Sequence, residues 1–125
     1  MNNVTLLGRV CNDLEIVDVK KSAYTRFSLA VADGKDKDGE PMTQFVPCIA
    51  WNSLAETLCE YVKKGDRLAI EGKLNIQRYT EEGEEKPRTT VQVICTRVHF
   101  IETKADREEK KEPVEEKKTY TKRKR

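Results

Sequence analysis

The stretch MTQFVPCIAWNSLAETLCEYVKKGDRLAIEGKLNIQRYT, residues 42–80, decides the fold because a strand, a helix and another strand follow one another in it. Residues 42–51 are rich in the β-branched, aromatic and other apolar residues typical of a strand. Pro47 has no N–H to donate to a neighbouring strand. We therefore expect this strand to lie at an edge, or to carry a bulge, at that residue.

A helix is predicted next. Ser53 and Glu56 have the spacing of a capping box, and Gly65 is a typical stop signal. The apolar residues that recur at helical spacing are Leu54, Leu58, Tyr61 and Val62, and the basic residues of the expected last turn are Lys63 and Lys64. Residues 67–80 then alternate as a strand does. One face would carry Leu68, Ile70, Gly72, Leu74 and Ile76, and the other Lys73, Asn75, Gln77 and Tyr79.

Strand patterns flank this central stretch on both sides. They cover residues 4–11, 24–33 and 89–102, and the charged segments 34–41 and 81–88 have the composition of long hairpin loops. Five strands with one helix between the third and the fourth is the order of the OB-fold, an all-β Greek-key barrel that binds oligonucleotides. The sequence therefore predicts this barrel over residues 1–103.

The composition of the chain indicates one domain with a charged tail. The chain has 125 residues, of which 37% are charged, and its net charge is +2. Residues 104–125 hold ten basic and six acidic residues with few apolar ones, so we expect a disordered tail with a basic end. No apolar run approaches the roughly 18 residues that span a bilayer, and the first residues lack the pattern of a secretory signal. We therefore expect a cytoplasmic, nucleoid-associated protein.

The residues that most often carry chemistry give no catalytic or metal pattern. The four cysteines are far apart in the sequence and lie in apolar surroundings, which favours buried, reduced thiols: Cys11, Cys48, Cys59 and Cys95. His99, the single histidine, lies in an apolar stretch and is interpreted as structural. No constellation of carboxylates with a catalytic Arg or His is recognisable, so we expect no enzyme activity, no cofactor and no metal.

Five segments resemble the single-stranded DNA-binding protein (SSB) family of bacteria and their phages. They are LLGRVCNDLE (6–15), FSLAVAD (27–33), F-x-P-C-x-A-W (45–51), A-E-x-x-x-x-Y-x-x-K-G (55–65) and I-E-G-K-L (70–74). The match covers about residues 2–102, in the family's order and spacing. The resemblance implies a protein that coats single-stranded DNA in replication, recombination and repair, and that forms a homotetramer, with a dimer as the alternative.

The family pattern also implies which residues contact DNA. Bases would stack on Phe45, Trp51 and Tyr79, because every base has a face that an aromatic ring can cover. The candidate phosphate contacts are Arg9, Arg26, Lys35, Lys37, Lys64, Lys73, Arg78 and Arg88. A core position remains an alternative for each of the three aromatics, and a solvated surface charge for each cation. Phe27 and Tyr61 lie on apolar faces and are predicted to be in the core.

The sequence departs from the family pattern at two places. Residues 32–35, Ala-Asp-Gly-Lys, hold no aromatic where the family has a further tryptophan, which predicts weaker stacking. Residues 122–125, Lys-Arg-Lys-Arg, stand in place of the acidic tip through which many relatives recruit replication and repair proteins. The basic end is expected to add phosphate contacts, to dock on an acidic partner or only to aid solubility. The alternative function is an OB-fold primosomal adaptor that acts mainly through protein contacts.

Overall fold

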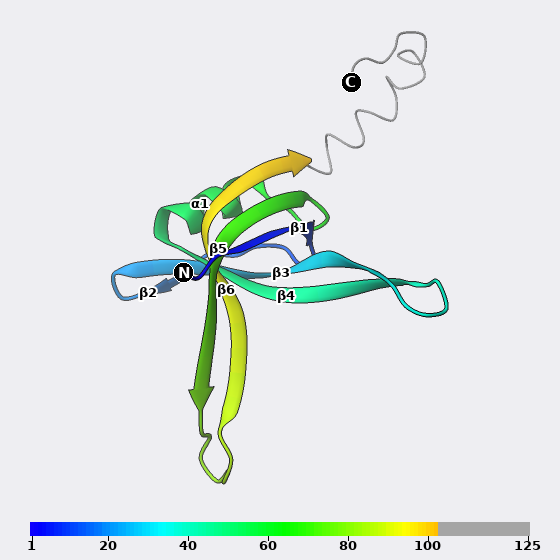
Figure 1. Cartoon of the computed structure of the whole chain (residues 1–125). Coiled ribbons are helices and arrows are strands. Elements are labelled where there is room, and N and C mark those ends of the chain that lie inside the picture. Colours follow the sequence, from blue (N-terminus) through cyan, green and yellow to red (C-terminus); the bar gives the residue numbers. More distant parts are fainter. Residues whose placement is uncertain (103–125) are drawn as a thin grey trace, which may run out of the picture.

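The computed structural model describes residues 1–102, so the expected tail lies outside the described residues. Its elements are β1 (Val4–Val10), β2 (Val17–Val19), β3 (Ser22–Lys35), β4 (Pro41–Trp51), α1 (Asn52–Tyr61), β5 (Arg67–Tyr79) and β6 (Arg88–Glu102). The strands are hydrogen-bonded in the order β1-β5-β6-β4-β3-β2, and a further β1–β3 pairing closes a ring. The five long strands and the helix between β4 and β5 form the predicted OB-fold barrel (Figure 1).

One short strand was not predicted. β2 forms a tight hairpin with β3, in which Val17 pairs with Tyr24 and Val19 with Ser22. All three residues of β2 are exposed. A three-residue strand with no buried face leaves no alternation in the sequence, so no pattern could reveal it.

The predicted capping of the helix is wrong at both ends. The helix begins one residue before Ser53, with Trp51 as its N-cap, and no side chain caps it by a hydrogen bond. It ends at Tyr61, so Lys63 and Lys64 follow the last turn instead of occupying it. The buried Asp66 stops the helix early, because its carboxylate accepts a hydrogen bond from the Lys63 N–H.

The expectation for Pro47 is confirmed. Pro47 lies opposite Ser28 of β3, while β4 pairs with β6 only at Cys48 and Ile49. The Ser28 N–H and C=O bond to Asn12 and Cys11, which shows that they point away from β4. The proline nitrogen therefore lies on the side of β4 that has no neighbouring strand at that residue.

The hydrophobic core fills the barrel beneath the helix. Its largest fully buried members include Leu29, Ile49, Leu58, Leu68 and Ile70. Phe27 is buried as predicted, but Tyr61 is 59% exposed and meets the ring of Phe100 edge-on with 6.3 Å between the ring centres. The helix ends at Tyr61, so its ring lies at the rim of the core and not inside it.

Two of the four cysteines are buried and all four are free thiols. Cys48 and Cys95 are buried, as predicted. Cys11 and Cys59 are only half-buried, so the prediction of buried thiols is wrong for these two. A hydrogen bond with the Cys95 thiol, together with burial, raises the pKa of Cys48. Cys48 therefore belongs to the core as a protonated thiol beside Cys95.

Two hairpins extend beyond the barrel, and we call them the β3–β4 arm (residues 31–45) and the β5–β6 arm (residues 73–93). In Figure 1 they leave the barrel in different directions. The apolar face predicted for residues 67–80 is buried only at Leu68, Ile70 and Gly72, and Leu74 and Ile76 are exposed on the arm. A side chain at Gly72 would collide with the Ile94 carbonyl, beside an irregularity in the β5–β6 register. The glycine marks the point where β5 leaves the barrel.

Within residues 1–102, no helix is both long and apolar enough to cross a membrane.

Candidate nucleic-acid interface

Phe45 and Trp51 lie on the same outward face of the paired strands β3 and β4. Trp51 is directly opposite Tyr24, and Phe45 is directly opposite Ala30. Both side chains are accessible, with Phe45 66% and Trp51 40% exposed. The alternative of a core tryptophan does not fit this exposure. The two rings stand six residues apart along this face of β4.

Tyr79 reaches this region from the β5–β6 arm. It lines a cleft of about 660 Å³ between the arm and the β3–β4 face. The polar side chains around the cleft include Asn12, Arg26, Ser28, Gln77, Thr90 and Gln92. Tyr79 is 41% exposed, so one part of its ring is open to a ligand. The predicted aromatics therefore come from two different hairpins, and the cleft lies between these hairpins.

Trp51 is held at a sharp turn of the chain. Asn52 follows it with φ of 56°, in the left-handed region that asparagine tolerates better than most residues. The Asn52 side chain accepts a hydrogen bond from the Ala23 N–H at 3.0 Å, which ties the start of α1 to β3. The turn sends the helix over the core and leaves the indole on the outer face.

Sequence reasoning assigned no role to Tyr24, which the structure brings into contact with Trp51. The two ring centres are 5.1 Å apart with the planes tilted by 53°. The Arg26 guanidinium lies 5.2 Å from the centre of the Tyr24 ring. Tyr24, Arg26 and Trp51 thus form one cluster at the end of the face nearest β2. Tyr24 and Arg26 are two residues apart in a strand, so the two-residue period places them on one face, but it does not show which residue of β4 lies opposite them.

Arg9 lies in a row of residues that runs across four strands toward Phe45. Successive pairs in the register are Arg67 with Arg9, Arg9 with Ala30, and Ala30 with Phe45. Directly paired residues share a face, and neighbouring strands are about 4.8 Å apart. Arg9 also donates to the Gly65 carbonyl at 3.2 Å. The row adds Arg67, which sequence reasoning did not single out.

The other candidate cations are distributed over both arms and one loop. Lys35 ends β3 and Lys37 lies in the loop at the tip of the β3–β4 arm. Lys73 shares the cleft-side face of the β5–β6 arm with Tyr79, whereas Arg78 lies on the opposite face of that arm. Lys64 lies in the turn after the helix, where its N–H donates to Asp13 at 3.3 Å. The structure therefore gathers most of the cations around the two arms but turns Arg78 away from Tyr79.

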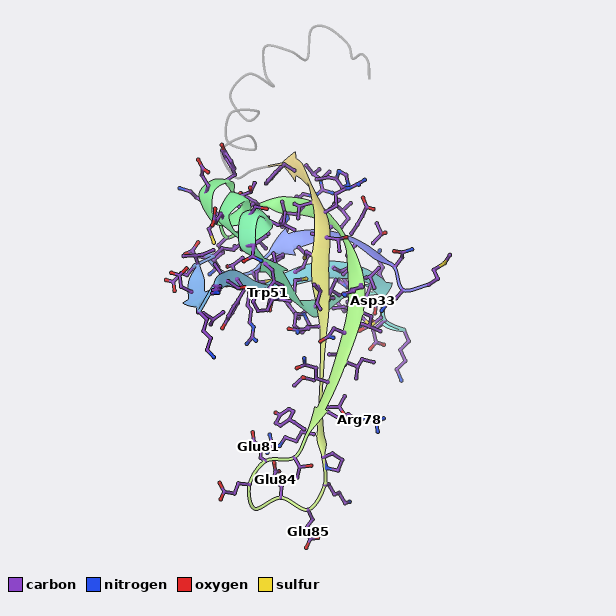
Figure 2. The ribbon with its side chains drawn as sticks, turned by 90° about the vertical axis from the view of Figure 1, so that its left-hand side faces the viewer. Asp33, Trp51, Arg78, Glu81, Glu84 and Glu85 are labelled. Carbon is purple, nitrogen blue, oxygen red and sulfur yellow. The ribbon has the colours of Figure 1, made fainter. Side chains whose placement is uncertain are left out.

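Arg88 is already paired with a carboxylate. It lies opposite Tyr79 in the register and makes two hydrogen bonds to Glu84, at 2.8 and 3.1 Å. The Glu84 carboxylate raises the pKa of the guanidinium. Figure 2 shows Glu81, Glu84 and Glu85 together at the tip of this arm, well below Trp51 and Asp33. The acidic tip thus adjoins the part of the arm that lines the cleft, which includes Tyr79 and Thr90.

An OB-fold with exposed aromatics and a cleft lined by an arginine and several polar side chains defines a nucleic-acid-binding protein of the single-strand type. Comparison with known families agrees with this class. The model of the "Single-strand binding protein family" matches residues 1–101. The chain belongs to this family, whose members bind single-stranded DNA and are not enzymes.

Three curated relatives illustrate the match, each described as a single-stranded DNA-binding protein. The protein from Onion yellows phytoplasma is 33% identical over 108 residues, which is 83% of this chain and 97% of the relative. The protein from Fusobacterium nucleatum is 37% identical over 109 residues, covering 83% of this chain and 69% of the relative. Single-stranded DNA-binding protein 1 from Streptococcus agalactiae is 32% identical over 110 residues, which is 86% of this chain and 67% of the relative.

Proposed function

We propose that single-stranded DNA lies across the β3–β4 face and through the cleft, so that the protein coats the strand without reading its sequence. Bases stack on Phe45, Trp51 and Tyr79. The phosphates are met by Arg9, Arg26, Lys35, Lys37, Lys64, Lys73, Arg78 and Arg88. Such a protein protects exposed strands during replication, recombination and repair, and it acts in the cytoplasm at the nucleoid.

The exposure of the three aromatics beside one cleft is the observation that carries this proposal. Large aromatic side chains usually lie in the core, yet between 40% and 66% of each of these three is exposed. Base stacking on such rings contributes about 1 to 3 kcal/mol per base. The primosomal adaptor gains no support, because an adaptor acting through protein contacts has no need of aromatics along a cleft.

A titration with oligo-dT tests the proposed path. Trp51 is the one tryptophan of the chain, so its emission reports on a single position. We expect strong quenching at saturation, and a loss of about 1 to 3 kcal/mol of binding free energy in the variants Trp51→Ala and Phe45→Ala. Tyr61→Ala is the matched control, because Tyr61 is an exposed ring at the rim of the core. Unchanged emission, or equal losses for Tyr61→Ala, would contradict the proposal.

We also propose that the protein works as a homotetramer. β1 pairs with β3 only at Arg9 and Val10, so the edge of β1 over residues 4–8 has no partner in β3. Leu7 on the outer face of β1 is 47% exposed, and Leu74 and Ile76 are exposed on one face of the β5–β6 arm. An open strand edge and exposed apolar residues are typical of surfaces that another copy covers. Replication and repair proteins are proposed as further partners.

A further inference from the structure

Trp51 is accessible on the face proposed for DNA, and Tyr24, to which the sequence assigned no role, lies against its ring. A tryptophan that stacks on a base must have its rotamer fixed when DNA is bound. Ordering a side chain only on binding weakens affinity by about two- to tenfold, because its rotamer freedom is lost at that moment. A neighbour that orders the ring beforehand removes this loss.

Tyr24 has the geometry of such a neighbour. It faces Trp51 directly across the β3–β4 ladder, and the ring centres are 5.1 Å apart at a tilt of 53°. Tilted aromatic pairs at this separation attract each other, because the edge of one ring meets the electron-rich face of the other. The contact is made by side chains of two paired strands, so it exists before DNA arrives.

Arg26 and Asn52 hold the two partners of this contact. The Arg26 guanidinium is 5.2 Å from the centre of the Tyr24 ring, a distance at which a cation is attracted to an aromatic face. Asn52 fixes the backbone directly after Trp51 through its hydrogen bond to the Ala23 N–H, one residue before Tyr24. The strand that carries Tyr24 and the turn that carries Trp51 are thereby tied together next to the aromatic contact.

We propose that Tyr24 is a positioning residue, which orders the Trp51 ring in the free protein so that it is ready to stack on a base. Arg26 contributes to this role through the Tyr24 ring, in addition to any phosphate that it meets. The inference rests on the proposed function in one respect, since it takes Trp51 as a base-stacking residue. It concerns the free protein, however, and can be tested there without DNA.

The first experiment measures the motion of the indole in the absence of DNA. Time-resolved fluorescence anisotropy of Trp51 is compared in the unchanged protein and in the variants Tyr24→Val, Tyr24→Leu and Tyr24→Phe. We expect fast local motion of the indole in the valine and leucine variants, and unchanged motion in the phenylalanine variant, which keeps the ring. Circular dichroism and thermal unfolding show which variants keep the fold. Tyr61→Val is the matched control, because it removes an exposed ring away from Trp51.

The second experiment is a double-mutant cycle in oligo-dT affinity. We expect Tyr24→Val to weaken binding by about two- to tenfold in the unchanged protein and to have no further effect in the Trp51→Ala background. An equal loss in both backgrounds would mean that Tyr24 contacts DNA by itself, and the inference would be wrong. Unchanged indole motion in both Tyr24→Val and Tyr24→Leu would also overturn it.

Failure of the proposed function gives a different result. If Trp51→Ala binds oligo-dT as tightly as the unchanged protein, Trp51 is not a stacking residue, whatever Tyr24 does to its motion. If Trp51→Ala weakens binding while the Tyr24 variants leave both motion and affinity unchanged, the stacking role stands and only the positioning role is wrong.

Discussion

Thr25 is a polar residue in a fully buried position of β3. It is 0% exposed and shares the inward face of the strand with Phe27 and Leu29. Its hydroxyl is the one buried side-chain oxygen or nitrogen without a hydrogen-bond partner in the part of the chain that the structure describes. A buried hydroxyl without a partner costs about 1 to 3 kcal/mol, because it has lost its hydrogen bonds to water. Threonine at this position therefore weakens the core that it helps to fill.

Replacing this hydroxyl by a methyl group should stabilise the protein. Valine has nearly the same shape as threonine and favours strands, so Thr25→Val removes the unpaired group without opening a cavity. We expect the free energy of unfolding to rise by about 1 kcal/mol, as measured by urea denaturation. Thr96→Val serves as control, because the Thr96 hydroxyl is exposed and donates to the Glu71 carbonyl. A loss of stability in Thr25→Val would show that the hydroxyl has a partner in solution.

The β5–β6 arm carries both residues that would attract DNA and acidic residues that would repel it. Lys73 and Tyr79 lie on the cleft-side face of the arm, where DNA would be attracted. Its tip carries a group of glutamates, of which Glu84 holds Arg88 in a bidentate pair with side-chain exposures of 35% and 55%. An exposed pair of this kind adds little stability because water screens it. In the proposed complex, Glu84 would compete with a DNA phosphate for the Arg88 guanidinium next to Tyr79.

Neutralising Glu84 should therefore strengthen DNA binding. In Glu84→Gln the Arg88 guanidinium becomes available to a phosphate, and one repulsive charge disappears from the arm. Each additional phosphate neutralised on single-stranded DNA steepens the plot of log affinity against log salt by about 0.7. Glu60→Gln makes the same charge change on the exposed surface of α1. Equal affinities and slopes for the two variants would mean that Arg88 does not contact DNA.

Elements with a strong alternation or a clear composition could be predicted from the sequence, and features that depend on pairing could not. Phe27, Leu29 and Val31 alternate with polar and small residues, which predicts the inward face of β3, and Phe27 and Leu29 are buried there. The same alternation continues through Leu74 and Ile76, and nothing local shows that β5 has left the barrel by then. The end of the helix depends on the buried Asp66, a tertiary feature that overrides the local signals of Lys63 and Lys64.

In the candidate site, too, the contacts that depend on strand register could not be predicted from local periodicity. Phe45 and Trp51 are six residues apart, so the two-residue period of a strand puts them on one side of β4, and the register agrees. Period alone cannot pair Trp51 with Tyr24, because the register depends on the length of the loop between β3 and β4 and on the irregularity between Ala32 and Lys35. The bond between Arg88 and Glu84 was also out of reach, since it requires the conformation of the tip.

At the scale of the whole molecule, the outer face of β1 and β5 is where another copy is proposed to pack. Leu7 lies opposite Ala69, and Ala69 lies opposite His99. His99 contacts the Glu71 carboxylate at 2.7 Å, and this hydrogen bond lowers the pKa of Glu71. An apolar residue beside a hydrogen-bonded pair presents both the packing and the polar contacts found in subunit interfaces.

A charge at Leu7 should break up the proposed tetramer. In Leu7→Lys an ammonium group would have to be buried between copies, which is strongly unfavourable without a partner. We expect sedimentation equilibrium to show a tetramer for the unchanged protein and a smaller species for this variant. Val19→Lys makes the same change on β2, where the valine is 40% exposed, and should leave the assembly intact. A monomer for the unchanged protein at micromolar concentration would contradict the proposal.

The parallel seam between β4 and β6 also governs how the chain reaches its fold. Only two register pairs form it, Cys48 with Val93 and Ile49 with Ile94, and no turn connects the two strands. The β3–β4 and β5–β6 hairpins can zip from their own loops, but the seam joins distant parts of the chain and must wait until a long loop has closed. Because β6 is the last strand of residues 1–102, the ring of these strands stays open until residue 94 has left the ribosome. Closure of the barrel must therefore follow the synthesis of both hairpins.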